Sequence, residues 1–120
     1  MGKIILFALL FLGINSFAQS DNLKLNRKEA IRLDSIGKVL HTMQKYKEAI
    51  EYFNKAMEIE PVNGEFIYHR ALSLANSHHH STDYTDICEE FKRAMKYGAY
   101  IDNPTLFFYG CKDLILEKKK

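Results

Sequence analysis

The feature that most constrains the fold is an internal repeat of apolar residues. The stretch YKEAIEYFNKAMEIEP at 46–61 is followed, thirty-eight positions later, by YTDICEEFKRAMKYG at 84–98. Matching aromatic, small and aliphatic residues occupy equivalent places in the two stretches: Tyr46 and Tyr84, Phe53 and Phe91, Ala56 and Ala94, Met57 and Met95. A repeat of this length predicts stacked copies of one supersecondary unit, each too small to bury its apolar face alone.

The residues that precede each stretch also repeat, with a shorter offset. Thirty-four positions separate the members of three further pairs: Leu33 and Ile67, Gly37 and Ala71, Leu40 and Leu74. The second unit therefore carries four additional residues between its two halves, and the histidine run at 78–80 lies among them.

Apolar residues recur from Leu33 onward at intervals of three and four, which is the spacing of an amphipathic helix. Asn26 followed by Glu29 resembles a capping box and predicts the start of the first helix. Pro61 lacks an amide hydrogen and ends the second helix, and a third helix follows Gly64. No stretch alternates with a period of two for long enough to predict a strand. The predicted fold class is all-α, with short connections between antiparallel helices.

Two more helices complete the pattern. Asp83 predicts the start of the fourth helix and Gly98 its end, because glycine suits a left-handed C-cap. Asn103 as N-cap and Pro104 in the first turn predict a fifth helix, which continues through LFFYGCKDLILEKKK to the C-terminus.

The first repeated unit carries a recognisable set of six residues: Gly37, Tyr46, Ala49, Phe53, Ala56 and Pro61. With these residues the chain resembles the tetratricopeptide repeat (TPR) family over residues 30–98, although Arg70, Ile87 and Gly98 depart from the family pattern. The resemblance implies a short α-α superhelix, a TPR-like solenoid of two helical hairpins and a closing helix. The expected segments are a linker and helix start at 19–29, repeats at 30–63 and 64–101, and a capping helix with basic tail at 102–120.

The N-terminus has the layout of a secretory signal peptide. One early lysine, Lys3, precedes an apolar run at 4–14, and small residues at Ser16 and Ala18 favour cleavage after residue 18. A run of about eleven residues is shorter than the roughly twenty that span a bilayer as a helix. We expect an exported protein, periplasmic or secreted, with residues 1–18 removed and no stable membrane insertion afterwards. An uncleaved anchor or a buried N-terminal helix is the alternative.

The remaining charge excludes some classes of partner. Without residues 1–18, 16 Lys and Arg stand against 15 Asp and Glu, and the three lysines at 118–120 are the main basic cluster. This balance predicts no nucleic-acid partner. No nucleophile is accompanied by a recognisable base and no glycine-rich loop follows a strand, so we predict neither an enzyme nor a cofactor.

Cys88 and Cys111 match neither a CxxC redox motif nor a four-ligand zinc pattern. In an exported chain they are free to form a disulfide. The alternative is that each is a small buried apolar residue.

The histidine run, His78, His79 and His80, suggests weak transition-metal binding, since imidazoles bind zinc, copper or nickel. A tight site needs three or four ligands, and His69 lies about 13 Å away along a helix. A solvated insertion loop is the alternative, so no metal site is assigned.

The family resemblance implies that the first helix of each hairpin lines a groove for a peptide or partner protein. The residues expected to face it are Asp34, Lys38, His41, Tyr68, His69, Leu72 and Asn76. For Tyr68 and Leu72, packing beneath the capping helix is the alternative. Asp34 would repel a terminal carboxylate, which argues against a clamp for C-terminal tails.

Two repeats are fewer than the three or more that usually bury a continuous core. Phe107 and Phe108 would point about 100° apart on a helix, so one of them staying exposed would favour a homodimer or a partner. Shielding of both is the alternative. The predicted function is an exported interaction module, a scaffold or adaptor, with a self-associating structural domain or metal binding as alternatives.

Overall fold

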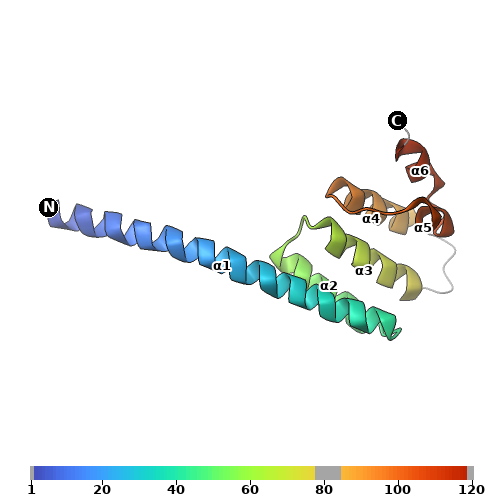
Figure 1. Cartoon of the computed structure of the whole chain (residues 1–120), viewed down its shortest axis with the longest axis horizontal. Helices are drawn as coiled ribbons and strands as arrows, with labels where there is room; N and C mark the ends of the chain where they lie inside the picture. Colours follow the sequence, from blue (N-terminus) through green and yellow to red (C-terminus); the bar gives the residue numbers. More distant parts are fainter. Residues whose placement is uncertain (1, 78–84, 119–120) are drawn as a thin grey trace.

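The computed structural model describes the backbone of residues 2–77 and 85–118, and the side chains of these residues except 2–21 and 85. In this part of the chain every regular element is an α-helix, which confirms the all-α, TPR-like fold class (Figure 1). The helices are α1 (Gly2–Thr42), α2 (Tyr46–Ile59), α3 (Gly64–Ser77), α4 (Thr85–Lys96), α5 (Asn103–Phe108) and α6 (Lys112–Lys118).

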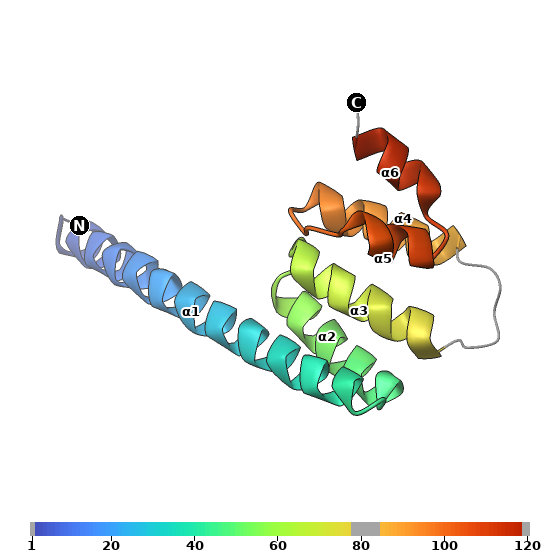
Figure 2. The same ribbon diagram turned by 45° about the vertical axis from the view of Figure 1, so that its right-hand side comes forward.

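The helices stack in chain order. The C-terminal part of α1 packs antiparallel to α2, α2 packs on α3, and α3 packs on α4, while α1 also contacts α3 (Figures 1 and 2). Helices α5 and α6 close the end of the stack beyond α3 and α4. The N-terminal part of α1 extends well past the two hairpins.

The first helix does not start at the residue that the sequence indicates. Helix α1 runs without interruption through Asn26 and Glu29, so these two residues do not form a capping box in the full chain. The apolar run near the N-terminus has high helix propensity and continues the helix backwards, which removes the need for a cap. Within the described residues, no helix is both long and apolar enough to cross a membrane.

Small residues bring the first two helices together. Ala49 and Ala56 are fully buried along α2, and Phe53 between them is also completely covered. The Phe53 ring occupies the space that a side chain at Gly37 would need, because a Cβ there would lie 2.7 Å from Phe53 Cδ1. Small residues at these positions therefore allow the two helix backbones to approach closely.

A second close approach joins the two helices of the second hairpin, where α3 begins and α4 ends. A Cβ at Gly64 would lie 2.5 Å from the carbonyl oxygen of Ala94 and 2.7 Å from the amide nitrogen of Ala99. The start of α3 thus sits directly against the backbone at the end of α4. The larger part of the core, around Ile67 and Phe91, continues from this point through α3, α4, α5 and α6.

Arg70, which departs from the family pattern, links three helices. Its guanidinium donates hydrogen bonds of 3.1 Å to Asn54 Oδ1 on α2 and to Glu90 Oε2 on α4. The arginine on α3 therefore connects its two neighbours by polar contacts where an apolar residue would connect them by packing.

Three helices end in the same backbone motif, with a residue at positive φ after the last turn. Gly98 (φ 98°) follows α4, and the amide of Ala99 donates to the carbonyl of Ala94 at 2.9 Å. These bonds satisfy carbonyls that a helix end would otherwise leave unpaired. The predicted C-cap at Gly98 is confirmed, whereas the predicted N-cap of α4, Asp83, lies outside the described residues.

The fifth predicted helix is wrong in two respects. It is broken into α5 and α6 at Gly110 (φ 77°), where the amide of Cys111 donates back to the carbonyl of Leu106 at 2.7 Å. Its N-cap is Asp102, one residue before the predicted Asn103, because the Asp102 carboxylate accepts a 2.7 Å hydrogen bond from the Thr105 amide. After the break, Lys118 at the end of α6 donates a hydrogen bond to the carbonyl of Ile101, in the segment between α4 and α5.

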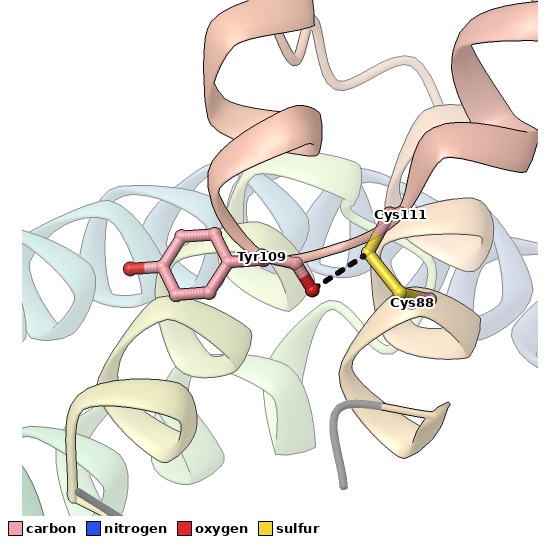
Figure 3. The surroundings of a disulfide bond; sticks show 3 residues. All are labelled: Cys88, Tyr109 and Cys111. Atoms are coloured by element: carbon pink, nitrogen blue, oxygen red, sulfur yellow. Dashed lines mark hydrogen bonds between the residues drawn. A yellow bond between two sulfur atoms is a disulfide. The ribbon is translucent and has the colours of Figure 1, made fainter. Parts of the chain in front are cut away.

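Cys88 on α4 and Cys111 between α5 and α6 form a disulfide bond, with Cα atoms 5.4 Å apart (Figure 3). The Tyr109 ring points away from the sulfur atoms, while its carbonyl oxygen lies 3.7 Å from Cys111 Sγ. A disulfide sulfur carries no hydrogen, so this last approach is a contact without a donated proton. The bond fixes the closing helices to the second hairpin.

Candidate partner-binding groove

The predicted groove residues fall into two groups, and the first group lies where α1 meets α3. Asp34 on α1 is only 5 % exposed, and its Oδ1 is 2.8 Å from Nδ1 of His69 on α3. Lys38 approaches the other oxygen of Asp34 at 3.9 Å. A buried carboxylate needs such partners to offset the loss of its hydration. These residues therefore hold the two hairpins together.

His41 adds a second polar contact to the same seam. Its Nδ1 is 2.7 Å from Oγ of Ser73, which is fully buried on α3. Burial lowers the pKa of His41 below its ordinary value of 6.5, and the nearby His69 lowers it further. His41 is therefore neutral near pH 7, and it contributes a hydrogen bond between hairpins without adding a charge.

The second group lines a hollow between α3 and α5. Tyr68 and Leu72, one turn apart on α3, face Phe108 of α5 across a cavity of ≈ 360 Å³. Phe108 is 76 % exposed and rests edge-on against Tyr109, with ring centroids 4.9 Å apart. We refer to the hollow lined by Tyr68, Leu72, Asp102, Pro104, Thr105, Phe108 and Tyr109 as the α3–α5 groove.

Asn76 stabilises the wall of this groove. Its side-chain amide donates to the Leu72 carbonyl at 2.7 Å and to the Tyr109 hydroxyl at 3.2 Å. The Tyr109 ring in turn packs edge-on against Phe91 of α4, with centroids 5.5 Å apart. Asn76 thus positions the closing segment against α3.

The lining of the groove includes one carboxylate, that of Asp102. The hydrogen bonds from Thr105 lower the pKa of Asp102, so this exposed carboxylate is ionised at neutral pH. Burial raises the pKa of the neighbouring Tyr68 hydroxyl, and the negative charge of Asp102 raises it further. Tyr68 therefore remains a neutral phenol beside a fixed negative charge.

Phe107 and Phe108 are both exposed, and they lie in different surroundings. Phe107 is 62 % exposed and does not line the α3–α5 groove. The ammonium group of Lys112 lies 5.2 Å from the centre of its ring. Exposed Leu116 follows Lys112 by one helical turn on α6. The closing helices therefore shield neither phenylalanine in the monomer.

The metal hypothesis is not addressed by the structure, because His78, His79 and His80 lie outside the described residues. Among the described residues, no group of three or more histidine, cysteine, aspartate or glutamate side chains is arranged to hold a metal ion.

Sequence reasoning did not identify Asp102 and Phe108 as members of the groove. Both enter it because the start and the end of α5 line the same hollow as Tyr68 and Leu72 of α3. The Asp-Asn-Pro-Thr segment is a recognisable helix start. Its N-cap can be either Asp102 or Asn103, and choosing Asp102 would have identified this carboxylate from the sequence. The position of Phe108 has no comparable sequence signal.

The stacked antiparallel hairpins define a helical-repeat protein. A family model described as tetratricopeptide repeat matches residues 30–63, which comprise the end of α1, α2 and the turn into α3. No curated protein and no solved structure matches the chain. The match supports a TPR family for the first hairpin, and members of this family are typically interaction modules without enzymatic activity. The second repeat, at 64–101, stays a prediction.

Proposed function

We propose that the protein is an exported interaction module that binds an extended segment of another protein in the α3–α5 groove. The observation that carries the proposal is the exposed Phe108, which faces Tyr68 and Leu72 across the groove. Aromatic side chains at the edge of an apolar hollow are typical anchors of protein interfaces. The fold supplies rigid walls, since α3 is packed on both sides and α5 is held by Asn76 and the disulfide.

Export is supported by the N-terminal sequence, with its early lysine, short apolar run and small residues before position 19. It is also consistent with a disulfide, because such bonds persist mainly outside the cytosol. Periplasmic and secreted locations fit these features equally well.

The test is crosslinking in the native host, followed by mass spectrometry to locate the contact on the full chain. The two adjacent phenylalanines provide a matched pair of variants, because both are exposed and only Phe108 lines the groove. Phe108→Ala should weaken partner binding about thirtyfold or more and reduce the yield of crosslinked partner accordingly, as for an interface anchor worth about 2 kcal/mol or above. Phe107→Ala should leave the yield unchanged. Equal yields from the two variants would contradict a groove-bound partner.

A further inference from the structure

The α3–α5 groove is lined by two chemically different kinds of surface. Leu72, Phe108 and the Tyr109 ring provide apolar surface. The Asp102 carboxylate and the Tyr68 hydroxyl provide polar surface, with Thr105 close to both. A ligand side chain in this groove could therefore contact apolar surface and a carboxylate together.

Asp102 supplies the negative charge among the residues that line the groove, and it is ionised because of its hydrogen bonds from Thr105. Glu65 lies one turn before Tyr68 on α3 but does not line the groove, and its carboxylate is 3.8 Å from Nε2 of His69. It adds only a weaker negative potential at the Tyr68 hydroxyl than Asp102 does.

Among the described residues, one cation acts on Asp102. Lys118 donates a hydrogen bond to the Ile101 carbonyl and lies 5.3 Å from the centre of the Tyr100 ring. Its charge lowers the pKa of Asp102 less than the hydrogen bonds from Thr105 do. Lys118 is also not among the residues that line the groove, so Asp102 is the charged side chain of the lining.

We propose that the α3–α5 groove recognises an arginine or lysine side chain of the partner, with its stem on Leu72 and Phe108 and its cation beside Asp102. This inference rests on the proposed function and adds the chemistry of the partner. Long basic side chains combine an apolar stem with a charged tip, which matches a groove lined by both apolar side chains and a carboxylate. The Tyr68 and Phe108 rings add a favourable interaction with a cation over an aromatic face.

Other ligand side chains match the groove less well. An acidic peptide would bring its carboxylates against Asp102 and Glu65, at a cost from like-charge repulsion. An aliphatic or aromatic side chain would contact the apolar surface and displace water from the Asp102 carboxylate. It would not replace the hydrogen bonds that this water makes to the carboxylate. A basic side chain is the class that complements both the apolar lining and the Asp102 carboxylate.

The test selects short random peptides, displayed on phage, for binding to the full chain. Asp102→Asn is the decisive variant, because asparagine caps a helix as well as aspartate and removes only the charge. Selected peptides should share an arginine or lysine, and the Asp102→Asn variant should bind them about three- to tenfold more weakly. Where the shared residue is arginine, replacing it by uncharged citrulline should weaken binding to the unmodified protein by a similar factor. The loss from citrulline and the loss from Asp102→Asn should not add when the citrulline peptide is tested on the variant.

The outcomes separate this inference from the proposed function. The selected peptides could require Phe108 but contain no basic residue, or could bind the Asp102→Asn variant as well as the unmodified protein. Either result overturns recognition of a basic side chain and leaves the groove as the binding site. If the selected peptides bind the Phe108→Ala variant as tightly as the unmodified chain, both this inference and the proposed function are overturned. A shared basic residue whose contribution disappears in Asp102→Asn, with an unchanged melting temperature, supports the inference.

Discussion

At the scale of single residues, Gly37 sets the distance between α1 and α2. Glycine normally weakens a helix interior by up to about 1 kcal/mol relative to alanine. Here the added methyl group would press on the fully buried Phe53 ring, with 2.7 Å to Cδ1. Overpacking of this kind costs about 1–3 kcal/mol, so it outweighs the gain in helix propensity. Gly37→Ala should therefore lower the free energy of unfolding, measured by urea denaturation.

Two variants check that the cause is the contact with Phe53. Ser35→Ala, at an exposed position of the same helix, should change stability by less than about 0.5 kcal/mol. Combining Gly37→Ala with Phe53→Leu should cost less than the two single losses added together, because the smaller side chain relieves the overlap. Strict additivity would contradict the steric explanation.

His41 makes the stability of the hairpin seam depend on pH. Its pKa is lowered in the folded protein by burial and by His69, so the unfolded chain takes up a proton near pH 6.5 and the folded chain only at lower pH. Between these values the unfolded state binds more protons, and the free energy of unfolding falls as the pH falls. The melting temperature should decrease from about pH 7 to pH 5, and less steeply in His41→Gln. Parallel pH profiles for the two proteins would rule out His41 as the source.

At the scale of helices, the elements whose ends are encoded locally are predictable from sequence. Pro61 gives the end of α2, and Gly98 gives the end of α4, because each acts through its own backbone conformation. The helical spacing of apolar residues likewise predicts an all-α fold. The start of α1 is not predictable in this way, since Asn26 is a competent cap that the helix passes through when helical residues precede it.

The closing helices show where local signals fail. Residues 103–118 have helical spacing throughout, yet the chain breaks at Gly110, where positive φ is easily adopted and the disulfide at Cys111 fixes the turn. The groove includes Phe108 and Tyr109, which end α5 just before this break. Similarly, Asp34 and His69 are 35 positions apart, so their contact exists only once the hairpins have stacked. The family resemblance predicts both as groove residues, and the sequence contains no local sign that they pair.

At the scale of the whole molecule, the protein is a very short solenoid with an unusual end. Two hairpins bury a limited core, and α5 and α6 extend it by adding Leu106, Tyr109 and Leu114 to the cluster around Phe91. The closing helices are short, at six and seven residues, and such lengths are not stable in isolation. Their place therefore depends on this packing and on the Cys88–Cys111 bond.

Reduction of the disulfide should affect stability and partner binding together. The bond closes a loop with a sequence separation of 23, and such a crosslink contributes about 3 kcal/mol by restricting the unfolded chain. Reducing the protein, or replacing both cysteines by alanine to avoid a buried polar group, should lower the melting temperature substantially. Because α5 forms one wall of the groove, capture of a Phe108-dependent partner should fall under conditions where α3 and α4 remain folded. Circular dichroism and capture measured across a titration of reductant test this, and a partner retained in full by the reduced, helical protein would show that the groove does not need the bond.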